Sequence, residues 1–392
     1  MLVPRGQQMR VLGLPMEGNF LVSGSAGSGK SIMALTRALN LAIVHPEDTV
    51  LLLVYVRSLS SFLGGMLSDV LPERTPVPNN LCIMGFHQYV YRCYQTFSGV
   101  PYGNIDSDGA AWDRFTDETA SLLQEPTCQH LVVDEGQDYT ASMIRFVRKC
   151  CSKSLTVFLD SAQTIFEGNG GLALYRQMLV LTEEPVYFSH DYRNCGEIAD
   201  FANGLRASQY WQGMPEDPVL ERDNNVDGRK PCVCYFAERE QEHSWLCQHD
   251  VLQNRGYQST AFLFNENGEI AEFRDNLLKH GIPQRDIQII NRQIGCFNTH
   301  CGIFLATYHN AKGLEFDNVF LPDFYVSTYE KDIQEKLHLC YVAFTRAKSM
   351  LNICCTRMSP LFDALPDATY EMVNFCNKQR MSMDDYFDDN PF

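Results

Sequence analysis

The sequence predicts an α/β protein with parallel β-sheets that are flanked by helices. A Gly-rich segment of phosphate-binding type, residues 24–31, stands between an apolar strand and a helix. Later strands are continuous in apolar residues rather than alternating, which is typical of parallel strands buried on both faces. Strands and helices alternate, and this alternation restarts after about residue 180. Two domains of α/β class follow from these observations.

Length and composition agree with a globular protein of roughly two domains, since 392 residues are 45% hydrophobic and 20% charged. No apolar run reaches the ~18 residues of a membrane span, and the N-terminus lacks a secretory signal pattern. We therefore expect no membrane partner and an intracellular location, cytoplasmic or, in a eukaryote, nuclear.

The net charge is −16, from 48 acidic and 32 basic residues. Proteins that coat nucleic acid through electrostatic attraction are usually basic. Any nucleic-acid contact must therefore lie in a local groove and use stacking and backbone donors rather than bulk charge.

Fifteen cysteines are scattered without a CxxC pair, so free thiols in a reducing compartment are favoured over a disulfide framework. A weaker alternative is metal ligation by one of three groups. These are Cys232 with Cys234, Cys247 with His249, and Cys296 with His300 and Cys301.

The Gly-rich segment has the G-x-x-x-x-G-K-[ST] pattern of a loop that binds nucleoside triphosphate phosphates. Its backbone N–H groups and the following helix dipole favour phosphate oxygens, Lys30 would reach the outer phosphates, and Ser31 would hold Mg²⁺. A chance Gly/Ser turn is the alternative, which the flanking strand and helix disfavour. The predicted cofactors are ATP and Mg²⁺, and the loop consists of Gly24, Ser25, Ala26, Gly27, Ser28, Gly29, Lys30 and Ser31.

Further strands are predicted at residues 49–55, 81–87 and 155–160, with a loop or small insertion at about 95–120. Another apolar strand at residues 130–133 leads into Asp134 and Glu135. Two adjacent carboxylates at a strand end are usually solvent-exposed side chains without a special role. When they follow a phosphate-binding loop in the sequence, they indicate a metal-binding and a catalytic side chain. Asp134 would hold Mg²⁺, and Glu135 would orient and deprotonate the attacking water.

The second half contains predicted strands at 260–264, 304–307, 318–321 and 350–354, and helices at 269–279 and about 339–348. The predicted domains are residues 1–180 and 181–376, followed by a polar, acidic tail at 377–392 that is expected to be disordered.

These pieces, in this order, resemble the motifs of superfamily 1 helicases of the UvrD/Rep/PcrA group. The phosphate loop is similar to motif I and residues 134–138 to motif II, with Gly136 where Ala is usual; residues 54–67 loosely resemble motif Ia, and Phe86-His87 motif Ib. The remaining motifs, III to VI, are matched by residues 160–166, 191–194, 309–316 and 341–347. The resemblance implies two RecA-like P-loop domains, 1A and 2A, with the ATP site in the cleft between them.

The resemblance also implies roles for single residues. Gln163 would sense the terminal phosphate, while Arg193 and Arg346 would close on the transition-state charge, where a planar guanidinium suits phosphate oxygens. Gly313 and Glu315 would border the nucleotide. Gln7 or Gln8 would read the adenine, with a preference for Gln8.

Aromatic side chains are candidates for a single-strand track, because stacking on rings tolerates any base. The candidates are Phe86, His87, Phe166, Tyr192 and His309. Tyr192 has adenine stacking as a second interpretation, and core packing is the alternative for all of these rings.

The chain departs from the larger helicases of the group in its spacing. About 45 residues separate Phe86 from the motif II strand, and about 115 separate motifs IV and V. We therefore expect a compact motor that lacks the full inserted subdomains, 1B and 2B, of the larger helicases. Their absence makes duplex separation less expected, whereas ATP hydrolysis does not depend on them. A protein partner, such as a nuclease or other subunit, could supply duplex contacts.

The acidic C-terminal segment, residues 384–392, resembles the tip of bacterial single-strand-binding proteins, which docks on protein partners. Residues 383–387 also resemble a degenerate sliding-clamp motif, although Arg380 stands where Gln is expected. A solvated acidic tail is the third interpretation.

The sequence thus predicts a DNA-dependent ATPase that translocates 3′ to 5′ on single-stranded or tailed DNA, a DNA helicase or helicase subunit of repair, replication or defence against foreign DNA. The alternatives are a nucleotide-gated DNA-binding or recruitment subunit without unwinding activity, and an RNA helicase.

Overall fold

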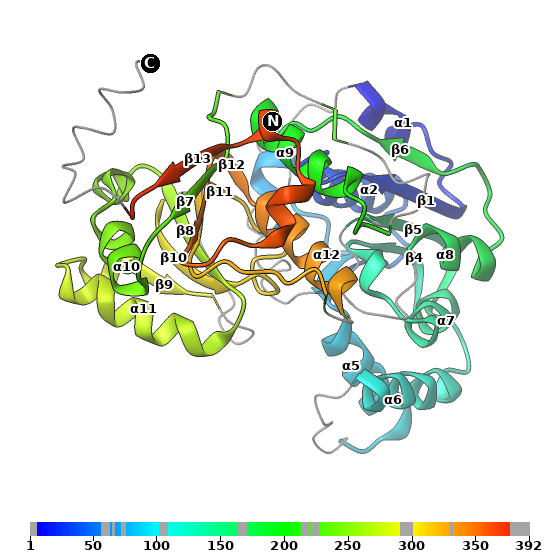
Figure 1. Cartoon of the computed structure of the whole chain (residues 1–392). Coiled ribbons are helices and arrows are strands. Elements are labelled where there is room, and N and C mark those ends of the chain that lie inside the picture. The colour runs from blue at the N-terminus through cyan, green and yellow to red at the C-terminus, as the bar shows by residue number, and fades with distance from the viewer. Residues whose placement is uncertain are drawn as a thin grey trace. The chain divides into compact units, whose positions relative to one another are not determined.

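The structure is a computed structural model that describes residues 6–55, 63–64, 67–71, 76–101, 109–160, 162, 171–212, 220–221, 227–290, 301–329 and 332–376. The chain forms two compact units (Figure 1). Over the described residues, the first unit runs from Gly6 to His190, and the second comprises Asp191–Gln212 and the residues from Leu220 onward.

The first unit contains a six-stranded sheet with the order β3-β2-β4-β5-β1-β6, in which every pairing is parallel. The strands are β1 (Gly18–Gly24), β2 (Val50–Val54), β3 (Leu81–Gly85), β4 (Cys128–Val133), β5 (Cys151–Leu159) and β6 (Val186–Phe188). The helices are α1 (Met9–Leu12), α2 (Lys30–Val44), α4 (Leu67–Val70), α5 (Phe86–Ser98), α6 (Gly109–Leu122), α7 (Ala141–Cys150) and α8 (Leu172–Met178), with short 3₁₀ turns η1 (Gly6–Gln8) and η2 (Gly136–Asp138).

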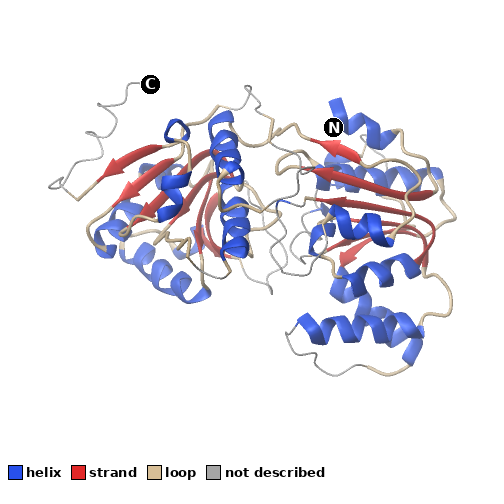
Figure 2. Cartoon of the chain, turned by 45° about the vertical axis from the view of Figure 1, so that its right-hand side comes forward, coloured by secondary structure: helices blue, strands red, loops and turns tan. Residues whose placement is uncertain are grey.

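This sheet is buried on both faces, which explains its continuous apolar strands. In β2, Leu51 and Leu53 enter a core that contains residues of α5, α7 and α8. Val50, Leu52 and Val54 enter the opposite core with residues of α2. Figure 2 shows helices on both sides of the strands. Because all strands are parallel, the loops after β1, β4 and β5 meet at one carboxyl edge.

The second unit contains a seven-stranded, fully parallel sheet with the order β13-β7-β12-β11-β8-β10-β9. The strands are β7 (Cys232–Tyr235), β8 (Ser259–Phe264), β9 (Ile287–Ile289), β10 (Gly302–Thr307), β11 (Phe316–Leu321), β12 (Ala347–Cys355) and β13 (Glu371–Asn374). The helices are α9 (Gly196–Ala207), α10 (Arg239–Gln248), α11 (Asn267–Lys279) and α12 (Ile333–Phe344), with short 3₁₀ turns η4 (Asp250–Asn254), η5 (Gln284–Asp286), η6 (Pro360–Ala364) and η7 (Asp367–Thr369).

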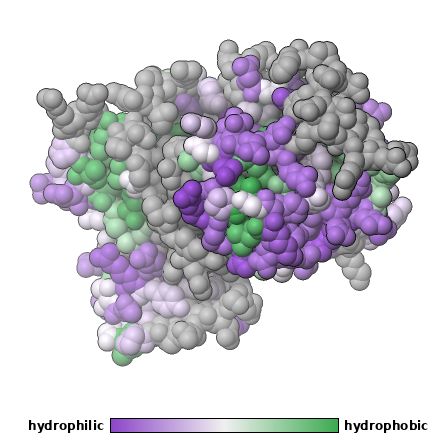
Figure 3. All heavy atoms as spheres, turned by 90° about the vertical axis from the view of Figure 1, so that its left-hand side faces the viewer, coloured by the Kyte–Doolittle hydropathy of each residue, from purple (hydrophilic) through white to green (hydrophobic). Residues whose placement is uncertain are grey.

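The predicted fold class is confirmed, since both units are parallel sheets flanked by helices. The face of the molecule in Figure 3 is largely hydrophilic where it is coloured, with smaller hydrophobic areas. No helix in the described ranges is long and apolar enough to cross a membrane.

Several sequence-based boundaries differ from the structure. The helix predicted at about 339–348 ends at Phe344, because Ala347 begins β12. The first unit runs to His190 rather than to residue 180, because β6 pairs with β1. The segment predicted at 95–120 as a loop or small insertion contains helix α6, in which Phe115 and Thr119 are buried, so the loop alternative is wrong there. The strand predicted at 81–87 ends at Gly85, and Phe86 begins α5. The predicted tail at 377–392 lies outside the described residues.

Candidate active site

The Gly-rich loop connects β1 to α2 at the carboxyl edge of the first sheet. Gly27 (φ 71°) and Gly29 (φ 82°) adopt left-handed backbone conformations, which glycine reaches without steric cost. A Cβ at Gly29 would lie 2.6 Å from the side-chain nitrogen of Gln8. Because α2 begins at Lys30, the N-terminus of a 15-residue helix follows the loop and favours anions there.

Lys30 lies over this loop and is 8% exposed. Its Nζ donates to the carbonyl oxygens of Gly24 (2.9 Å) and Ser25 (2.7 Å) and lies 3.4 Å from Oδ2 of Asp160. The sequence interpretation missed Asp160 as a partner of this ammonium. The residue directly follows β5, and a strand end beside a phosphate loop was the available signal. Lys30 therefore has oxygen partners that phosphate oxygens could replace.

Asp134 follows β4 directly and is 1% exposed. Neither of its carboxylate oxygens has a hydrogen-bond partner among the described residues. Burial, and then the neighbouring Glu135 carboxylate, raises the pKa of Asp134 to about 7, whereas the Ser31 hydroxyl and the Lys30 ammonium act in the opposite direction. A buried carboxylate without partners, beside a serine hydroxyl, offers the oxygen ligands that Mg²⁺ prefers. The residues at this edge therefore fit the predicted metal ion.

Glu135 has a left-handed backbone (φ 58°), which is uncommon for a residue with a side chain. Its Oε2 accepts a hydrogen bond from Nε2 of Gln137, and Oε1 of Gln137 accepts from the backbone N–H of Asp160 at 2.9 Å. The fully buried Gln137 thus connects the loop after β4 to the end of β5. Sequence reasoning gave Gln137 no role, although it lies two residues after the predicted base. The amide fixes the direction of the Glu135 carboxylate.

Gly136, the departure from the usual motif, is explained by packing. A Cβ at this position would lie 2.4 Å from Cγ1 of Val157 and 3.1 Å from the Tyr175 hydroxyl. The same hydroxyl donates a hydrogen bond to the Gly136 carbonyl at 2.9 Å. Val157 and Tyr175 are both fully buried, so neither side chain can easily move aside.

The two N-terminal glutamines make different contacts. Gln7 donates from Nε2 to Oγ of Ser189 (3.0 Å) and accepts from the Ser189 backbone N–H (2.8 Å), so both ends of its amide are engaged. Gln8 donates to the carbonyl oxygen of Ser28 in the phosphate loop (3.0 Å). Gln8 is thus the glutamine in contact with the loop, and its adenine-reading role stays a prediction.

In the second unit, one carboxylate organises the segment predicted to be motif IV. Oδ1 of Asp191 accepts hydrogen bonds from the backbone N–H groups of Arg193 (2.9 Å) and Asn194 (3.1 Å). Nδ2 of Asn194 donates to the carbonyl oxygens of Thr345 (3.1 Å) and Ala347. These bonds hold residues 191–194 against the start of β12, so the predicted motifs IV and VI are adjacent.

Arg193 has an incompletely satisfied guanidinium. Its Nη1 lies 3.9 Å from Oε2 of Glu315, while Nε and Nη2 are buried and have no hydrogen-bond partner among the described residues. Glu315 also lies 3.2 Å from Nζ of Lys348, so its charge is shared between two cations. Arg193 therefore keeps donors for an anionic ligand, as its predicted role requires.

Arg346 is 1% exposed, and its guanidinium is engaged within its own unit. Nε donates to the Val342 carbonyl (2.9 Å), Nη1 to the Leu314 carbonyl (3.1 Å) and Nη2 to the Thr345 hydroxyl (3.1 Å). The guanidinium holds the end of α12 to the loop before β11. In this loop Gly313, the residue before Leu314, has a left-handed backbone (φ 78°).

The predicted nucleic-acid contacts have mixed outcomes. Phe86 is fully buried and its ring packs 4.8 Å from the Tyr139 ring, so it belongs to the core and the prediction for this residue is wrong. His87, Tyr192 and His309 are half-buried, and their roles stay predictions. The two remaining candidates, Gln163 and Phe166, lie outside the described residues.

Two side-chain groups in the described part of the chain have metal-binding geometry, and neither contains a cysteine. They are His45 with Asp48 and His130, and Glu242 with His243 and Asp323. The two aspartates each already have a cation at Oδ2, since Lys153 lies 2.8 Å from Asp48 and Arg239 lies 2.9 Å from Asp323.

In the described ranges no predicted cysteine belongs to a group of three or more side chains with metal-binding geometry. Cys232 and Cys234 are buried free thiols with their sulfur atoms 3.5 Å apart. Cys247 is also a buried free thiol, and burial raises its pKa to about 12. Cys296 and His300 lie outside the described residues.

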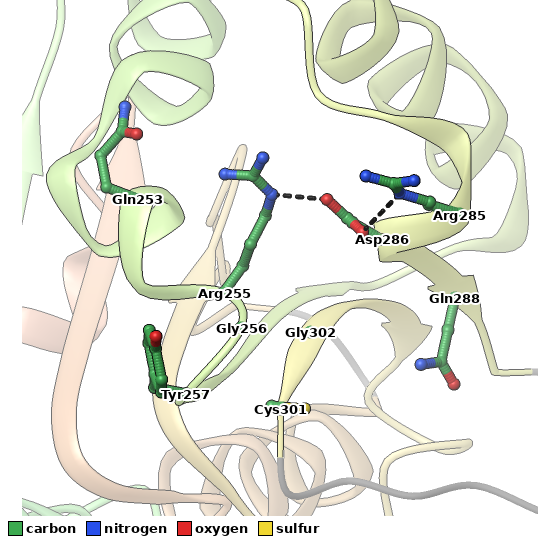
Figure 4. A pocket seen from close by; sticks show the side chains of 9 residues that line it. All are labelled: Gln253, Arg255, Gly256, Tyr257, Arg285, Asp286, Gln288, Cys301 and Gly302. Carbon is green, nitrogen blue, oxygen red and sulfur yellow. Dashed lines mark hydrogen bonds and ion pairs between the residues drawn. The ribbon is translucent and has the colours of Figure 1, made fainter.

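A pocket of about 400 Å³ lies in the second unit at the amino ends of β8 and β10 (Figure 4). Two arginines line it, but both already face one carboxylate: Nε of Arg255 and Nε of Arg285 lie 2.7 Å and 3.7 Å from Asp286. Tyr257 at its rim is 89% exposed. The two guanidinium groups share one carboxylate, so the lining of this pocket has one positive charge in excess.

Comparison with known proteins gives a family for part of the chain. Residues 285–358 match the UvrD-like helicase C-terminal domain. A protein of Acanthamoeba polyphaga mimivirus assigned as an ATP-dependent DNA helicase is 50% identical over 261 residues, which cover 61% of this chain and 36% of the relative. A Mycoplasma pneumoniae protein assigned as a DNA helicase is 25% identical over 253 residues, covering 59% and 45%. DNA helicase II of Rickettsia typhi is 31% identical over 117 residues, covering 27% and 16%.

The chain therefore spans less than half the length of each of these relatives. The crystal structure of the C-terminal domain of a possible DNA helicase from Lactobacillus plantarum is 18% identical, covers 46% of this chain and 98% of that chain, and has a TM-score of 0.34, too low to bear on the fold. Residues 285–358 are thus similar to a UvrD-like helicase C-terminal domain, and longer parts of the chain are similar to proteins assigned as DNA helicases.

Proposed function

We propose that the chain is a DNA-dependent ATPase and 3′-to-5′ translocase, a DNA helicase or helicase subunit of repair, replication or defence against foreign DNA. The observation that carries the proposal is the buried Asp134 carboxylate without partners, beside Ser31 and the phosphate loop. A buried charge of this kind is costly unless a cation or proton neutralises it. Mg²⁺ that accompanies ATP is the natural cation for this position.

Each side chain at the carboxyl edge of the first sheet has a separate role in the proposed ATP hydrolysis. Lys30 binds the outer phosphates in place of its carbonyl partners, and Ser31 and Asp134 hold Mg²⁺, which neutralises developing phosphate charge when bound. Glu135 accepts the proton of the attacking water, and Gln137 keeps that carboxylate in place. The unsatisfied donors of Arg193 are proposed to stabilise the transferring phosphate.

DNA is proposed as the track because the curated relatives are assigned as DNA helicases. An RNA helicase is the alternative within the same mechanism. The alternative of a different functional class is a nucleotide-gated DNA-binding or recruitment subunit without unwinding activity. The net charge of −16 motivates it, because an acidic protein has little general attraction for DNA phosphates.

Rates of ATP hydrolysis with single-stranded DNA, duplex DNA and RNA, measured side by side, test the proposal. We expect single-stranded DNA to stimulate most, and 3′-tailed duplexes to be unwound in preference to 5′-tailed ones. Stimulation by RNA alone would contradict the DNA assignment. DNA binding without stimulated hydrolysis would favour the recruitment subunit.

We also propose that residues 384–392 recruit a protein partner, such as a nuclease or other subunit. Pull-downs with the full chain and with a chain lacking the last twelve residues provide the test. Loss of a bound protein on truncation is expected, and an unchanged set of bound proteins would contradict the docking role.

A further inference from the structure

Three side chains of the first unit gather around one point away from the proposed ATP site: His45, Asp48 and His130. His45 directly follows α2, Asp48 lies in the loop before β2, and His130 lies near the start of β4. One nitrogen or oxygen atom from each residue lies within 4.8 Å of the other two. Because β2 and β4 are parallel neighbours, this group lies at the amino edge of the sheet, whereas Asp134 follows β4 at the carboxyl edge.

The distances within this group suit a metal ion with nitrogen and oxygen ligands. Oδ2 of Asp48 lies 3.1 Å from Nε2 of His130 and 3.9 Å from Nδ1 of His45. The two imidazole rings are stacked, with their centroids 5.1 Å apart and their planes at 29°. Tetrahedral Zn²⁺ with bonds of about 2.0–2.2 Å places neighbouring ligand atoms about 3.4 Å apart. Small side-chain adjustments therefore bring all three atoms to one ion.

The two histidines are available as ligands for different reasons. Nδ1 of His45 lies beyond hydrogen-bond distance from Asp48, and its buried Nε2 has no hydrogen-bond partner among the described residues. His130 is fully buried, and its Nδ1 lies 2.7 Å from the hydroxyl oxygen of Ser154. This hydroxyl can accept a hydrogen bond from Nδ1–H and leave the lone pair of Nε2 for a metal. Metal-bound histidines usually have such a partner at their second nitrogen.

The loop that carries His45 and Asp48 is held in place by protein groups. Nδ2 of Asn80 donates to the carbonyl oxygens of His45 (3.0 Å) and Asp48 (2.8 Å). The backbone N–H of Thr49 donates to Oε1 of Gln129 in β4 at 2.8 Å. These bonds connect the loop to the strand that carries the third ligand. The ligands are thus positioned before an ion binds, which lowers the cost of binding.

The group that contains His243 and Asp323 is less suited to a metal ion. Nε of Arg239 donates to both carboxylate oxygens of Asp323 (3.0 and 2.9 Å), and Nε2 of His243 lies 2.9 Å from the same carboxylate. Asp48 instead faces the ammonium of Lys153 at 2.8 Å, and this lysine side chain is 38% exposed. A flexible lysine at the surface can turn into water and leave the carboxylate to a metal ion.

We propose that His45, Asp48 and His130 bind Zn²⁺, with water at the fourth position. Two imidazole nitrogens and one carboxylate oxygen are ligands that Zn²⁺ takes in proteins. The ion connects the C-terminal end of α2 to β4, and a cation near the last turn of a helix is itself favourable. Lys30 begins α2 at its other end, so this site is structural and does not depend on the proposed function.

Metal titration of the full chain provides the first test. We expect the reduced, nucleotide-free chain, stripped with a chelator, to bind one Zn²⁺ in competition with a chromophoric chelator. Co²⁺ then reports the ligand type, because the chain has fifteen cysteines that could also bind metal. Visible d–d bands without a thiolate charge-transfer band are expected for nitrogen and oxygen ligands. Absence of Zn²⁺ binding, or a thiolate band with Co²⁺, would overturn the proposal.

Substitutions place the ion on these residues. We expect His45→Gln to weaken Zn²⁺ binding about a hundredfold, and His280→Gln, at an exposed histidine of the second unit, to leave it unchanged. Lys153→Gln should strengthen Zn²⁺ binding about fivefold, because the ammonium no longer competes for Asp48. A misfolded chain would not gain affinity, so this variant separates ligation from folding. Equal Zn²⁺ affinity in His45→Gln and the parent chain, or no gain in Lys153→Gln, would overturn the site.

Discussion

Among the described residues, the buried Asp134 at the carboxyl edge of the first sheet has fewer hydrogen-bond partners than Arg346 has in the second unit. At the first-unit edge, Asp134 has no hydrogen-bond partner among the described residues, and Lys30 is held by backbone carbonyl oxygens and Asp160. In the second unit, each nitrogen of the Arg346 guanidinium donates to a neighbour of its own unit. Buried groups that lack partners are costly and so indicate a ligand, whereas satisfied groups hold a fold together.

Arg193 has few partners among the described residues although it belongs to the second unit. It lies in the second unit, yet two of its buried nitrogens have no partner in the described part of the chain. In this respect it resembles Asp134 more than Arg346. Two arginines that the sequence treated alike are thus expected to differ in function.

The largest effect is expected from Glu135→Gln, which removes the proposed base at the first-unit edge. ATP turnover should fall about a hundredfold or more, while nucleotide binding persists, because the amide cannot accept the proton. Steady-state hydrolysis and nucleotide titration measure the two properties. The exposed Glu118→Gln is the matched control. Turnover that survives Glu135→Gln would remove this carboxylate from the mechanism.

The two arginines should separate activity from stability. Arg193→Ala should lower stimulated ATP turnover and leave the free energy of unfolding nearly unchanged, since among the described residues its guanidinium makes only a 3.9 Å ion pair. Arg346→Ala removes the donor of the Leu314 carbonyl, at a cost of about 1–3 kcal/mol, whereas the Val342 carbonyl still accepts from the Thr345 hydroxyl. Denaturant unfolding and ATPase assays of both variants check this. Equal destabilisation by the two substitutions would contradict the claim that Arg346 stabilises the fold and Arg193 does not.

Gly136→Ala should destabilise the first unit by about 1–3 kcal/mol, because the added methyl overlaps Val157. The displaced loop would also move Glu135, so ATP turnover should fall. Thermal unfolding of Gly136→Ala and of the double variant Gly136→Ala/Val157→Ala measures the first effect. Partial recovery of stability in the double variant is expected, and a neutral Gly136→Ala would contradict the packing argument.

A smaller, pH-dependent effect is expected from Asp134. Its folded-state pKa of about 7 lies above the ordinary value of 3.8, so the folded chain keeps a proton that the unfolded chain releases. This residue's contribution to stability is therefore lost as pH rises from about 4 to about 7.

Without Mg²⁺, the melting temperature of Asp134→Asn should exceed that of the parent chain by more at pH 8 than at pH 5. Adding Mg²⁺ and nucleotide should stabilise the parent chain more at the higher pH. A difference between the two chains that does not vary with pH would argue against a buried, titrating Asp134.

The sequence predicted the fold class because continuous apolar strands and helical segments alternate clearly in both halves. Its errors came from segments whose role depends on distant contacts. α6 follows polar, Gly-rich sequence, and only its packing on α5 and α7 shows that it is a helix. β6 is three residues long and is recognised only by its pairing with β1.

Motif spacing predicted that Lys30 lies at the start of a helix and that Asp134 follows a strand, as the structure has them, while their roles stay predictions. Phe86 was misassigned because a sequence does not show which way a ring points, and here it enters the core. Gln137 and Asp160 were missed because their roles depend on hydrogen bonds between separate strand ends. The contrast between Arg193 and Arg346 likewise depends on partners that spacing does not reveal.

ATP hydrolysis by the full chain with and without single-stranded DNA, compared with that of Lys30→Ala, tests the central claim most directly. The account predicts turnover that rises when the strand is added and is lost in the variant, because Lys30 is the cation held at the phosphate loop. Turnover that ignores the strand, or that survives Lys30→Ala, would contradict it.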